Sequence, residues 1–213
     1  MSSSVFMRGG PLMWPLLLCS IVSLTISIER IFFWWKERKQ SDDVLLEEVF
    51  LRTEKGDFDS ALSVRDGGAS GNKKPGFATR ILLFGLAHRG SGLTPSMEVA
   101  ATDEIRRMKR GLNVLDTIIT MAPLLGILGT VLGIIDSFDL LGSSGIEDPK
   151  AVTGGIAQAL ITTATGLAVA LVTLVPFNYL VGKVQKATED TNKLIVRFEA
   201  AYQKGLEVTG SDK

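Results

Sequence analysis

Hydroxyl and amide side chains recur inside two long stretches of this sequence that contain no charged residue. Residues 117–135 and 151–182 lack Asp, Glu, Lys and Arg, and each stretch is long enough to cross a bilayer, which takes about 20 apolar residues. A helix that only anchors a protein has no reason to bury so many hydroxyls, whereas a helix that packs closely on others or lines a pathway does. The polar residues that raise this question are Thr130, Gln158, Thr162, Thr163 and Thr165.

Small residues form a stripe along one face of each stretch when it is drawn as a helix. The stripe of the first stretch consists of Ala122, Gly126, Gly129, Gly133 and Ser137, with Thr130 beside it. The stripe of the second consists of Gly155, Ala159, Thr163, Gly166, Ala170 and Thr173. Such stripes let helix backbones approach closely in lipid. The residues at which we expect helix packing are Gly126, Gly129, Gly133, Gly155, Ala159 and Gly166.

Two interpretations of the polar residues remain open. In the first, the stripes are packing surfaces only, and each threonine bonds the carbonyl four residues earlier in its own helix. In the second, the helices also border a wet path, because Gln158, Thr162 and Thr165 form a separate polar line one face away. A single three-helix chain would not satisfy both stripes internally, so we expect a symmetric homo-oligomer with a central path. Pro123 removes an internal hydrogen bond and is expected to kink its helix.

A third apolar segment, residues 11–35, lies near the N-terminus. Its apolar run is too long for the core of a signal peptide, and no small-x-small cleavage site precedes Glu29 and Arg30. We therefore predict a retained transmembrane helix with Trp34 and Trp35 as interfacial anchors. The Glu29 and Arg30 side chains can pair with each other or reach the membrane surface.

Lys and Arg residues near the segment ends predict the orientation of the three segments. Basic residues follow the first segment, precede the second and follow the third, whereas the opposite ends carry only Arg8 and Lys150. The positive-inside rule therefore places the N-terminus outside and the C-terminus in the cytoplasm. The predicted organisation is an outer N-terminus (1–10), a first transmembrane helix (11–35), a cytoplasmic helical region (36–110), a second transmembrane helix (111–138), an outer loop (139–149), a third transmembrane helix (150–182) and a cytoplasmic helical tail (183–213).

The charged region 36–110 is expected to be helical. A helix start is predicted at residues 41–43, Gly56 ends that helix, and residues 57–64 can add a further turn or two. The glycine-rich stretch 66–76 is typical of a flexible connection.

Two long helices are expected to project from the membrane. The Thr-Pro pair at residues 94–95 combines an N-cap with proline at the first helical position, and we expect one helix from there to about residue 138. The Asp-Pro pair at residues 148–149 starts the third helix, which can continue through residues 183–204. The sequence therefore predicts an all-α membrane protein with three transmembrane helices, of which the second and third extend into a cytoplasmic helical bundle.

Composition and motifs argue against several functional classes. The chain of 213 residues has 23 basic and 23 acidic residues, and this zero net charge argues against a nucleic-acid partner. Cys19 is the single cysteine, so an intrachain disulfide is impossible, and His88 has no second imidazole for a metal site. The sequence has no glycine-rich phosphate loop and no nucleophile motif. We therefore expect neither an enzyme nor a bound cofactor or metal.

Two long motifs carry a family resemblance. The sequences MAPLLGILGTVLGIIDSF at residues 121–138 and GIAQALITTATGLAVALVTLVPFNYL at residues 155–180 resemble the signature helices of the MotA/TolQ/ExbB proton-channel family, most closely its ExbB and TolQ branch. The GDFDSAL stretch at residues 56–62 and the first helix ending in Glu29 and Arg30 also fit. The resemblance covers nearly the whole chain.

The resemblance implies a stator of an ion-driven motor in the bacterial inner membrane, with a periplasmic N-terminus. Family members form a homo-pentamer around the paired membrane helices of a single-pass partner of the ExbD/TolR type, and an aspartate of that partner carries the proton. The proton motive force then energises a TonB- or TolA-like protein for outer-membrane transport or envelope work. By this resemblance Thr130 and Thr163 face the pore. We expect the ion pathway to include Thr130 and Thr163 together with Gln158 and Thr162 of the polar line.

Gln158 departs from the family pattern. Many ExbB proteins have a glutamate at this position, and glutamine can form hydrogen bonds but cannot titrate. No Asp, Glu, His, Lys or Arg lies within the two charge-free stretches, and Asp116 and Asp136 lie at the ends of the first. We therefore expect the titrating group on a partner. The resemblance leaves open the ExbB or TolQ branch and proton or sodium coupling, and the alternative function is a non-conducting membrane scaffold that clusters partner proteins.

Overall fold

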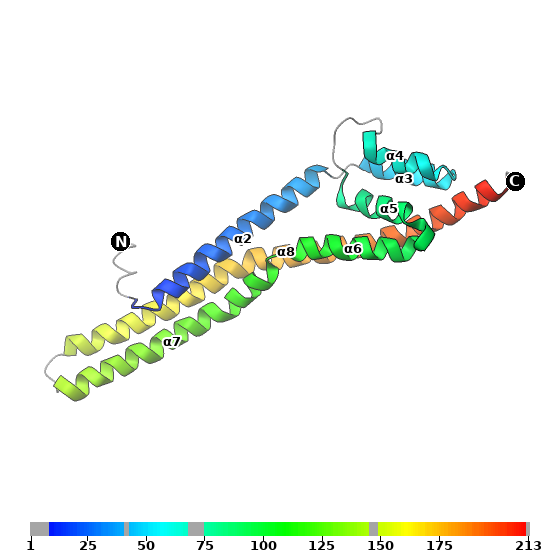
Figure 1. Cartoon of the computed structure of the whole chain (residues 1–213). Coiled ribbons are helices and arrows are strands. Elements are labelled where there is room, and N and C mark those ends of the chain that lie inside the picture. The colour runs from blue at the N-terminus through cyan, green and yellow to red at the C-terminus, as the bar shows by residue number, and fades with distance from the viewer. Residues whose placement is uncertain (1–8, 41–42, 68–74, 145–148, 212–213) are drawn as a thin grey trace. The chain divides into compact units, whose positions relative to one another are not determined.

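The computed structural model describes residues 9–40, 43–67, 75–144 and 149–211 (Figure 1). Within these residues every regular element is a helix, so the predicted all-α class is confirmed. The elements are α2 (Met13–Gln40), α3 (Asp43–Glu54), α4 (Phe58–Gly67), α5 (Phe77–Ala87), the 3-10 helix η1 (Arg89–Ser91), α6 (Leu93–Lys109), α7 (Leu112–Ser144) and α8 (Pro149–Ser211).

Three stretches of helix are long and apolar enough to cross a membrane, which confirms the predicted number of candidate spans. They are Met13–Glu37, the stretch Leu93–Asp139, which contains α6 and most of α7, and Thr153–Gly210. The chain divides into two compact units. The first unit comprises Met1–Arg30 and Gly111–Leu180, and the second comprises Ile31–Arg110 and Val181–Lys213.

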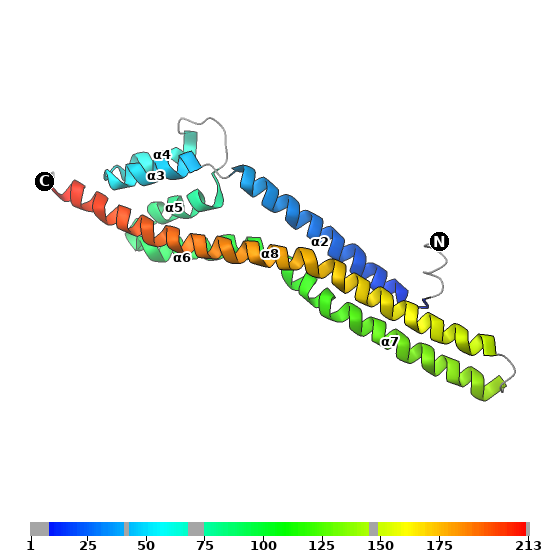
Figure 2. The ribbon, with the colours of Figure 1, turned by 180° about the vertical axis from the view of Figure 1, so that it is seen from behind.

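The first unit contains the beginning of α2, the whole of α7 and the first part of α8. In this unit α7 and α8 run antiparallel and side by side, as both ribbon views show (Figure 2). A Cβ atom added to Gly166 would lie 2.5 Å from the Ala122 carbonyl oxygen, so the two backbones approach too closely for a side chain there. The α2 helix packs on this pair through Met13 and Leu16, which form a buried apolar cluster with Ala122.

The predicted continuous helix from residue 94 to about residue 138 is wrong, because the structure has two helices there. Gly111 separates α6 from α7 and has a φ angle of +81°, in the left-handed region that favours glycine and ends a helix. The predicted N-cap at Thr94 is also wrong. Gly92, with a φ of +105°, is the N-cap of α6, and Pro95 lies inside the first turn.

A glycine and an aspartate organise the turn between α3 and α4. Gly56 follows α3 with a φ of +76°, as expected for the residue that ends this helix. The Asp57 carboxylate accepts a hydrogen bond from the Ser60 backbone N–H at 3.1 Å and so caps α4. A hydrogen bond from the Ser60 side chain, and then this one from the Ser60 backbone, lowers the pKa of Asp57. The predicted starts at residues 41–42 and 148 and most of the glycine-rich connection lie outside the described residues.

The second unit has an apolar core to which α3, α4, α5, α6 and the end of α8 contribute. Phe198 of α8 is fully buried and meets Phe50 of α3 edge to face, with ring centroids 5.1 Å apart. The sequence repeat at Leu194, Phe198 and Tyr202 is therefore the packing face of this part of α8, with Tyr202 partly buried. The other large side chains that are fully buried in this core are Ile81, Leu82, Leu86, Met97 and Val49.

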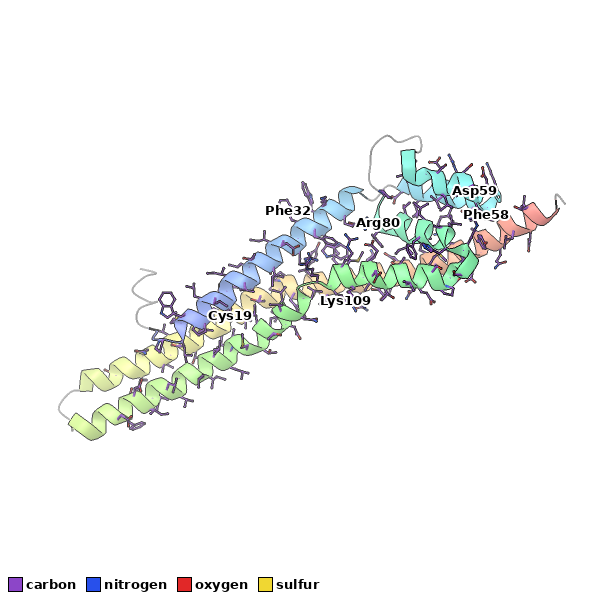
Figure 3. The ribbon with its side chains drawn as sticks, viewed as in Figure 1. Cys19, Phe32, Phe58, Asp59, Arg80 and Lys109 are labelled. Atoms are coloured by element: carbon purple, nitrogen blue, oxygen red, sulfur yellow. The ribbon has the colours of Figure 1, made fainter. Side chains whose placement is uncertain are left out.

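Arg80, labelled in Figure 3, lies on α5 and pairs with carboxylates of two further helices of the second unit. Its Nη2 atom lies 3.1 Å from Glu37 Oε1 of α2 and 2.8 Å from Glu104 Oε2 of α6. The Phe77 backbone N–H donates to the same Glu37 oxygen at 3.0 Å. Hydrogen bonding to Glu104 and the charges of both carboxylates raise the pKa of Arg80, so the guanidinium stays charged. The cluster fixes the end of α2 against α5 and α6.

Candidate functional site

Thr130 on α7 and Thr163 on α8 bring their hydroxyl groups together across the contact between the two helices. Thr163 Oγ1 donates to the Gly126 carbonyl oxygen at 2.9 Å, and the two Oγ1 atoms are hydrogen-bonded to each other. Thr130 Oγ1 also lies 3.3 Å from the Gly126 oxygen. Both threonines are half-buried. The result is a polar pair between two apolar helices that stays partly open to its surroundings.

The absence of a side chain at Gly126 makes this pair possible. A Cβ atom there would lie 3.0 Å from Thr163 Cα and 3.3 Å from the Thr162 carbonyl oxygen. A larger residue would push α8 away and separate the hydroxyl of Thr163 from that of Thr130.

The two small-residue stripes contact each other within one chain. A Cβ atom on Gly133 would lie 3.0 Å from Ala159 Cβ, and one on Gly155 would lie 3.2 Å from the Gly133 carbonyl oxygen. The expectation that a single chain cannot satisfy both stripes is therefore wrong, because α7 and α8 are antiparallel neighbours and each offers its stripe to the other. The stripes alone give no argument for an oligomer.

Gln158 and Thr162 lie beside the residues that precede α2, and the Thr162 methyl group also packs against Gly129 of α7. Thr162 is 1% exposed, and its Oγ1 lies 2.6 Å from the Gly9 carbonyl oxygen and 3.0 Å from the Gln158 carbonyl oxygen. The Gln158 side chain is half-buried and fills the space next to Gly10, where a Cβ atom would meet it. The structure thus brings together two pairs, Thr130 with Thr163 and Gln158 with Thr162, rather than one group of four.

Thr165 and Thr173 of α8 bond within their own helix. Thr165 Oγ1 donates to the Ile161 carbonyl oxygen at 2.8 Å, and Thr173 Oγ1 donates to the Val169 carbonyl oxygen at 2.7 Å. Each of these bonds reaches the carbonyl four residues earlier, as expected if the threonines serve helix packing only. Thr163 differs because its acceptor belongs to α7.

The α2 helix covers a face of α7 that does not include Thr130. A groove between them is lined on the α2 side by Leu18, Cys19 and Val22. Its α7 wall consists of Asn113, Val114, Thr117, Ile118 and Met121. Since Thr130 lies about 100° or more around the helix from the centre of this wall, its hydroxyl belongs to the side of the α7–α8 pair that α2 leaves open.

Neither proline interrupts its helix. Pro123 lies inside α7 and Pro176 inside α8, and each helix continues past it. Sequence reasoning named Pro123 as a kink but assigned no role to Pro176. The sequence did not predict the contact of Gly9 and Gly10 with α8. A pair of glycines before a helix carries no pattern that indicates such a contact.

The described part of the chain contains no candidate metal-binding site. No group of three His, Cys, Asp or Glu residues there could hold an ion. His88 stacks on Phe84, and its Nδ1 lies 2.9 Å from the Phe84 carbonyl oxygen, which gives the single histidine a local structural partner.

Comparison with known proteins identifies the family of this chain. The family model of the MotA/TolQ/ExbB proton channel family matches residues 77–193. Biopolymer transport protein ExbB-like 1 of Synechocystis sp. is 39% identical over 83% of this chain and 69% of its own length. An ExbB homolog of Methanothermobacter thermautotrophicus is 34% identical over 84% of this chain, which spans 63% of that protein.

A further match, over a shorter part of the chain, is to a protein named ExbB itself. Biopolymer transport protein ExbB of Aquifex aeolicus is 39% identical over 40% of this chain and 57% of its own length. The names describe transport proteins and the family is one of proton channels, so the comparisons agree in excluding an enzyme. With its three candidate membrane helices and its paired hydroxyls, this chain belongs to the MotA/TolQ/ExbB proton channel family, in the ExbB/TolQ-like branch.

Proposed function

We propose that this chain is the channel-forming subunit of a proton-driven motor in a bacterial inner membrane. A single-pass partner of the ExbD/TolR type would supply the titrating aspartate, and the complex would energise a TonB- or TolA-like protein for outer-membrane transport or envelope work. The N-terminus lies in the periplasm and the C-terminus in the cytoplasm in this proposal. Membership of a proton channel family and the positions of Lys and Arg around the spans support it.

The observation that carries the proposal is the Thr130–Thr163 pair. Two hydroxyls and the Gly126 carbonyl oxygen meet between otherwise apolar helices, half-buried on the side that α2 leaves open. A partner helix on that side would bring its carboxylate to this pair, and the hydroxyls could hand a proton to it or order water beside it. Hydrogen bonds between helices stabilise their packing in a bilayer, because the lipid tails offer these hydroxyls no other polar partner.

Gln158 and Thr162 would belong to the same path at a level nearer the start of α8. The half-buried Gln158 amide can order water near Gly10, whereas the buried Thr162 hydroxyl is bonded to the Gly9 carbonyl oxygen. Neither side chain can carry a proton as a charged intermediate at physiological pH.

The alternative function is a scaffold that clusters partner proteins without conducting ions. The apolar core and the Arg80 cluster hold the helices of the second unit together, and the outer faces of these helices would bind such partners. The absence of Asp, Glu, His, Lys and Arg from residues 117–135 and 151–182 is compatible with this alternative as well.

Valine at the two threonine positions separates the two functions. Thr130→Val and Thr163→Val keep the side-chain shape but remove a hydroxyl, and each should lower proton flux through the reconstituted complex about fivefold, which corresponds to the loss of about 1 kcal/mol of hydrogen bonding. Size-exclusion chromatography in detergent should show unchanged assembly. Thr165→Val is the matched control, because the Thr165 hydroxyl bonds only within α8. If the complex with the unaltered chain conducts no protons, the scaffold is the better description.

A further inference from the structure

We propose that the Asp116 carboxylate is an ion-relay group of this subunit, located between the Thr130–Thr163 pair and the Leu112 end of α7. The inference rests on the proposed function, because a relay has a purpose only in a conducting complex. It adds a titratable residue of this chain to a path whose other members here are hydroxyls and an amide.

The first observation is the face of α7 on which Asp116 lies. Six residues recur at alternating spacings of four and three and therefore share one face, which we call the free face of α7. They are Asp116, Thr120, Pro123, Ile127, Thr130 and Ile134. Asp116 and Thr130 thus lie on the same side of the helix, about 21 Å apart along its axis at about 1.5 Å per residue.

The second observation is that the other helices of the first unit leave most of the free face uncovered, and Thr130 at its edge is the member that contacts α8. Asp116 and Thr120 are exposed, and the Ile127 and Ile134 side chains are 55% and 39% exposed. The contacts of α7 with α8 run through the glycine stripe and Thr130, and its contacts with α2 run through Ala122 and the Val114, Ile118 and Met121 side. Exposure of a carboxylate on this face leaves it available to ions that move along the face.

The third observation is that the Asp116 carboxylate has no side-chain partner within the described part of the chain. The Thr120 hydroxyl lies 3.3 Å from the Asp116 carbonyl oxygen and 2.9 Å from the Thr117 carbonyl oxygen, so it bonds the backbone and leaves the carboxylate alone. An isolated carboxylate on a membrane helix is costly and marks an ion or proton path more often than a structural contact.

Polar groups continue from Asp116 toward Thr130. Pro123 has no N–H, so the Ile119 carbonyl oxygen four residues earlier loses its donor within the helix. Ile119 adjoins the free face and is half-buried. The Thr120 hydroxyl and the Ile119 carbonyl oxygen are thus polar groups located between the Asp116 carboxylate and the Thr130 hydroxyl. A proton arriving through water on this face would bind a carboxylate oxygen of Asp116 and leave it again to water at the Leu112 end.

The test compares four variants of the full chain in complex with its single-pass partner, reconstituted in vesicles that report proton flux. Asp116→Asn keeps the size but cannot bind and release a proton, and it should lower flux at least about tenfold, as the loss of a positioned acid–base group does. Asp116→Glu should retain most of the flux. Asp136→Asn is the matched control, because Asp136 is an exposed aspartate of the same helix outside the free face.

The remaining variant, Thr130→Val, distinguishes failure of this inference from failure of the proposed function. Reduced flux in Thr130→Val together with unaltered flux in Asp116→Asn would overturn the relay and leave the channel intact. Equal losses in Asp116→Asn and Asp136→Asn would also overturn it, because the effect would then be one of charge at the helix ends. A complex that conducts no protons even without substitutions would overturn both proposals.

Chemical labelling provides a measurement that does not depend on activity. Asp116→Cys in a Cys19→Ser background places one thiol on the free face, since Cys19 is the single cysteine of the chain. A charged, membrane-impermeant thiol reagent should modify it in the assembled complex if water reaches Asp116. Protection of this thiol from the reagent would contradict the relay.

Discussion

At the scale of residues, the candidate pathway depends on groups that bond across helices rather than within one. Thr163 and Thr165 are of the same type and two positions apart, yet Thr163 reaches the Gly126 carbonyl of α7 and Thr165 only its own helix. The sequence shows only that both side chains carry a hydroxyl group. Only the approach of α7 distinguished them, since the difference lies in what faces each side chain.

Gln158 provides a prediction at this scale. Gln158→Glu should retain partner-dependent activity, because the half-buried side chain lies beside the backbone of Gly10 and a carboxylate oxygen can accept the same water contacts. Gln158→Leu should lower activity more, since leucine cannot order water. Both would be measured at matched expression. Normal activity of Gln158→Leu with lost assembly of Gln158→Glu would instead show a dry contact between subunits.

At the scale of elements, the glycine contact between α7 and α8 determines how closely the pathway helices pack. The Ala122 carbonyl oxygen occupies the space where a Gly166 side chain would lie, and backbone cannot move aside as a flexible side chain can. The Arg80 cluster has a comparable part in the second unit, where it joins α2, α5 and α6 through two carboxylates.

Alanine substitution tests the glycine contact. Gly166→Ala should destabilise the first unit by about 1–3 kcal/mol, the usual cost of overpacking, and should separate the Thr130 and Thr163 hydroxyls. Gly182→Ala is the control in the same helix, because an added Cβ atom there meets nothing within 4 Å. Thermal unfolding in detergent would compare the two. Equal melting temperatures would contradict the close approach of α7 and α8.

At the scale of the whole molecule, the proposed homo-oligomer no longer follows from the small-residue stripes. The remaining support comes from the family and from the free face of α7, on which Asp116 and Thr120 are exposed although the helix is apolar enough to span a membrane. Polar groups on such a face are stable when they border water or a partner.

Native mass spectrometry in mild detergent tests the assembly. We expect a homo-pentamer of the full chain, with two copies of the single-pass partner bound when both proteins are expressed together. Asp116→Asn should leave this stoichiometry unchanged if the carboxylate acts on ions rather than on subunit contacts. A monomer at every protein concentration would contradict the central path.

The sequence by itself determined the class of protein, the number of spans and the family, because long charge-free runs and two extended motifs are local properties of the chain. It could not place the break at Gly111, since a glycine followed by helix-forming residues is compatible with a continuous helix until tertiary contacts select the left-handed conformation. Nor could it decide which polar residues meet. Helical spacing shows which side chains share a face, whereas the antiparallel register of α7 and α8 decided that Thr130 faces Thr163 while Gln158 and Thr162 face Gly9 and Gly10. That register depends on the complementarity of two distant glycine stripes, which is a property of the folded pair alone.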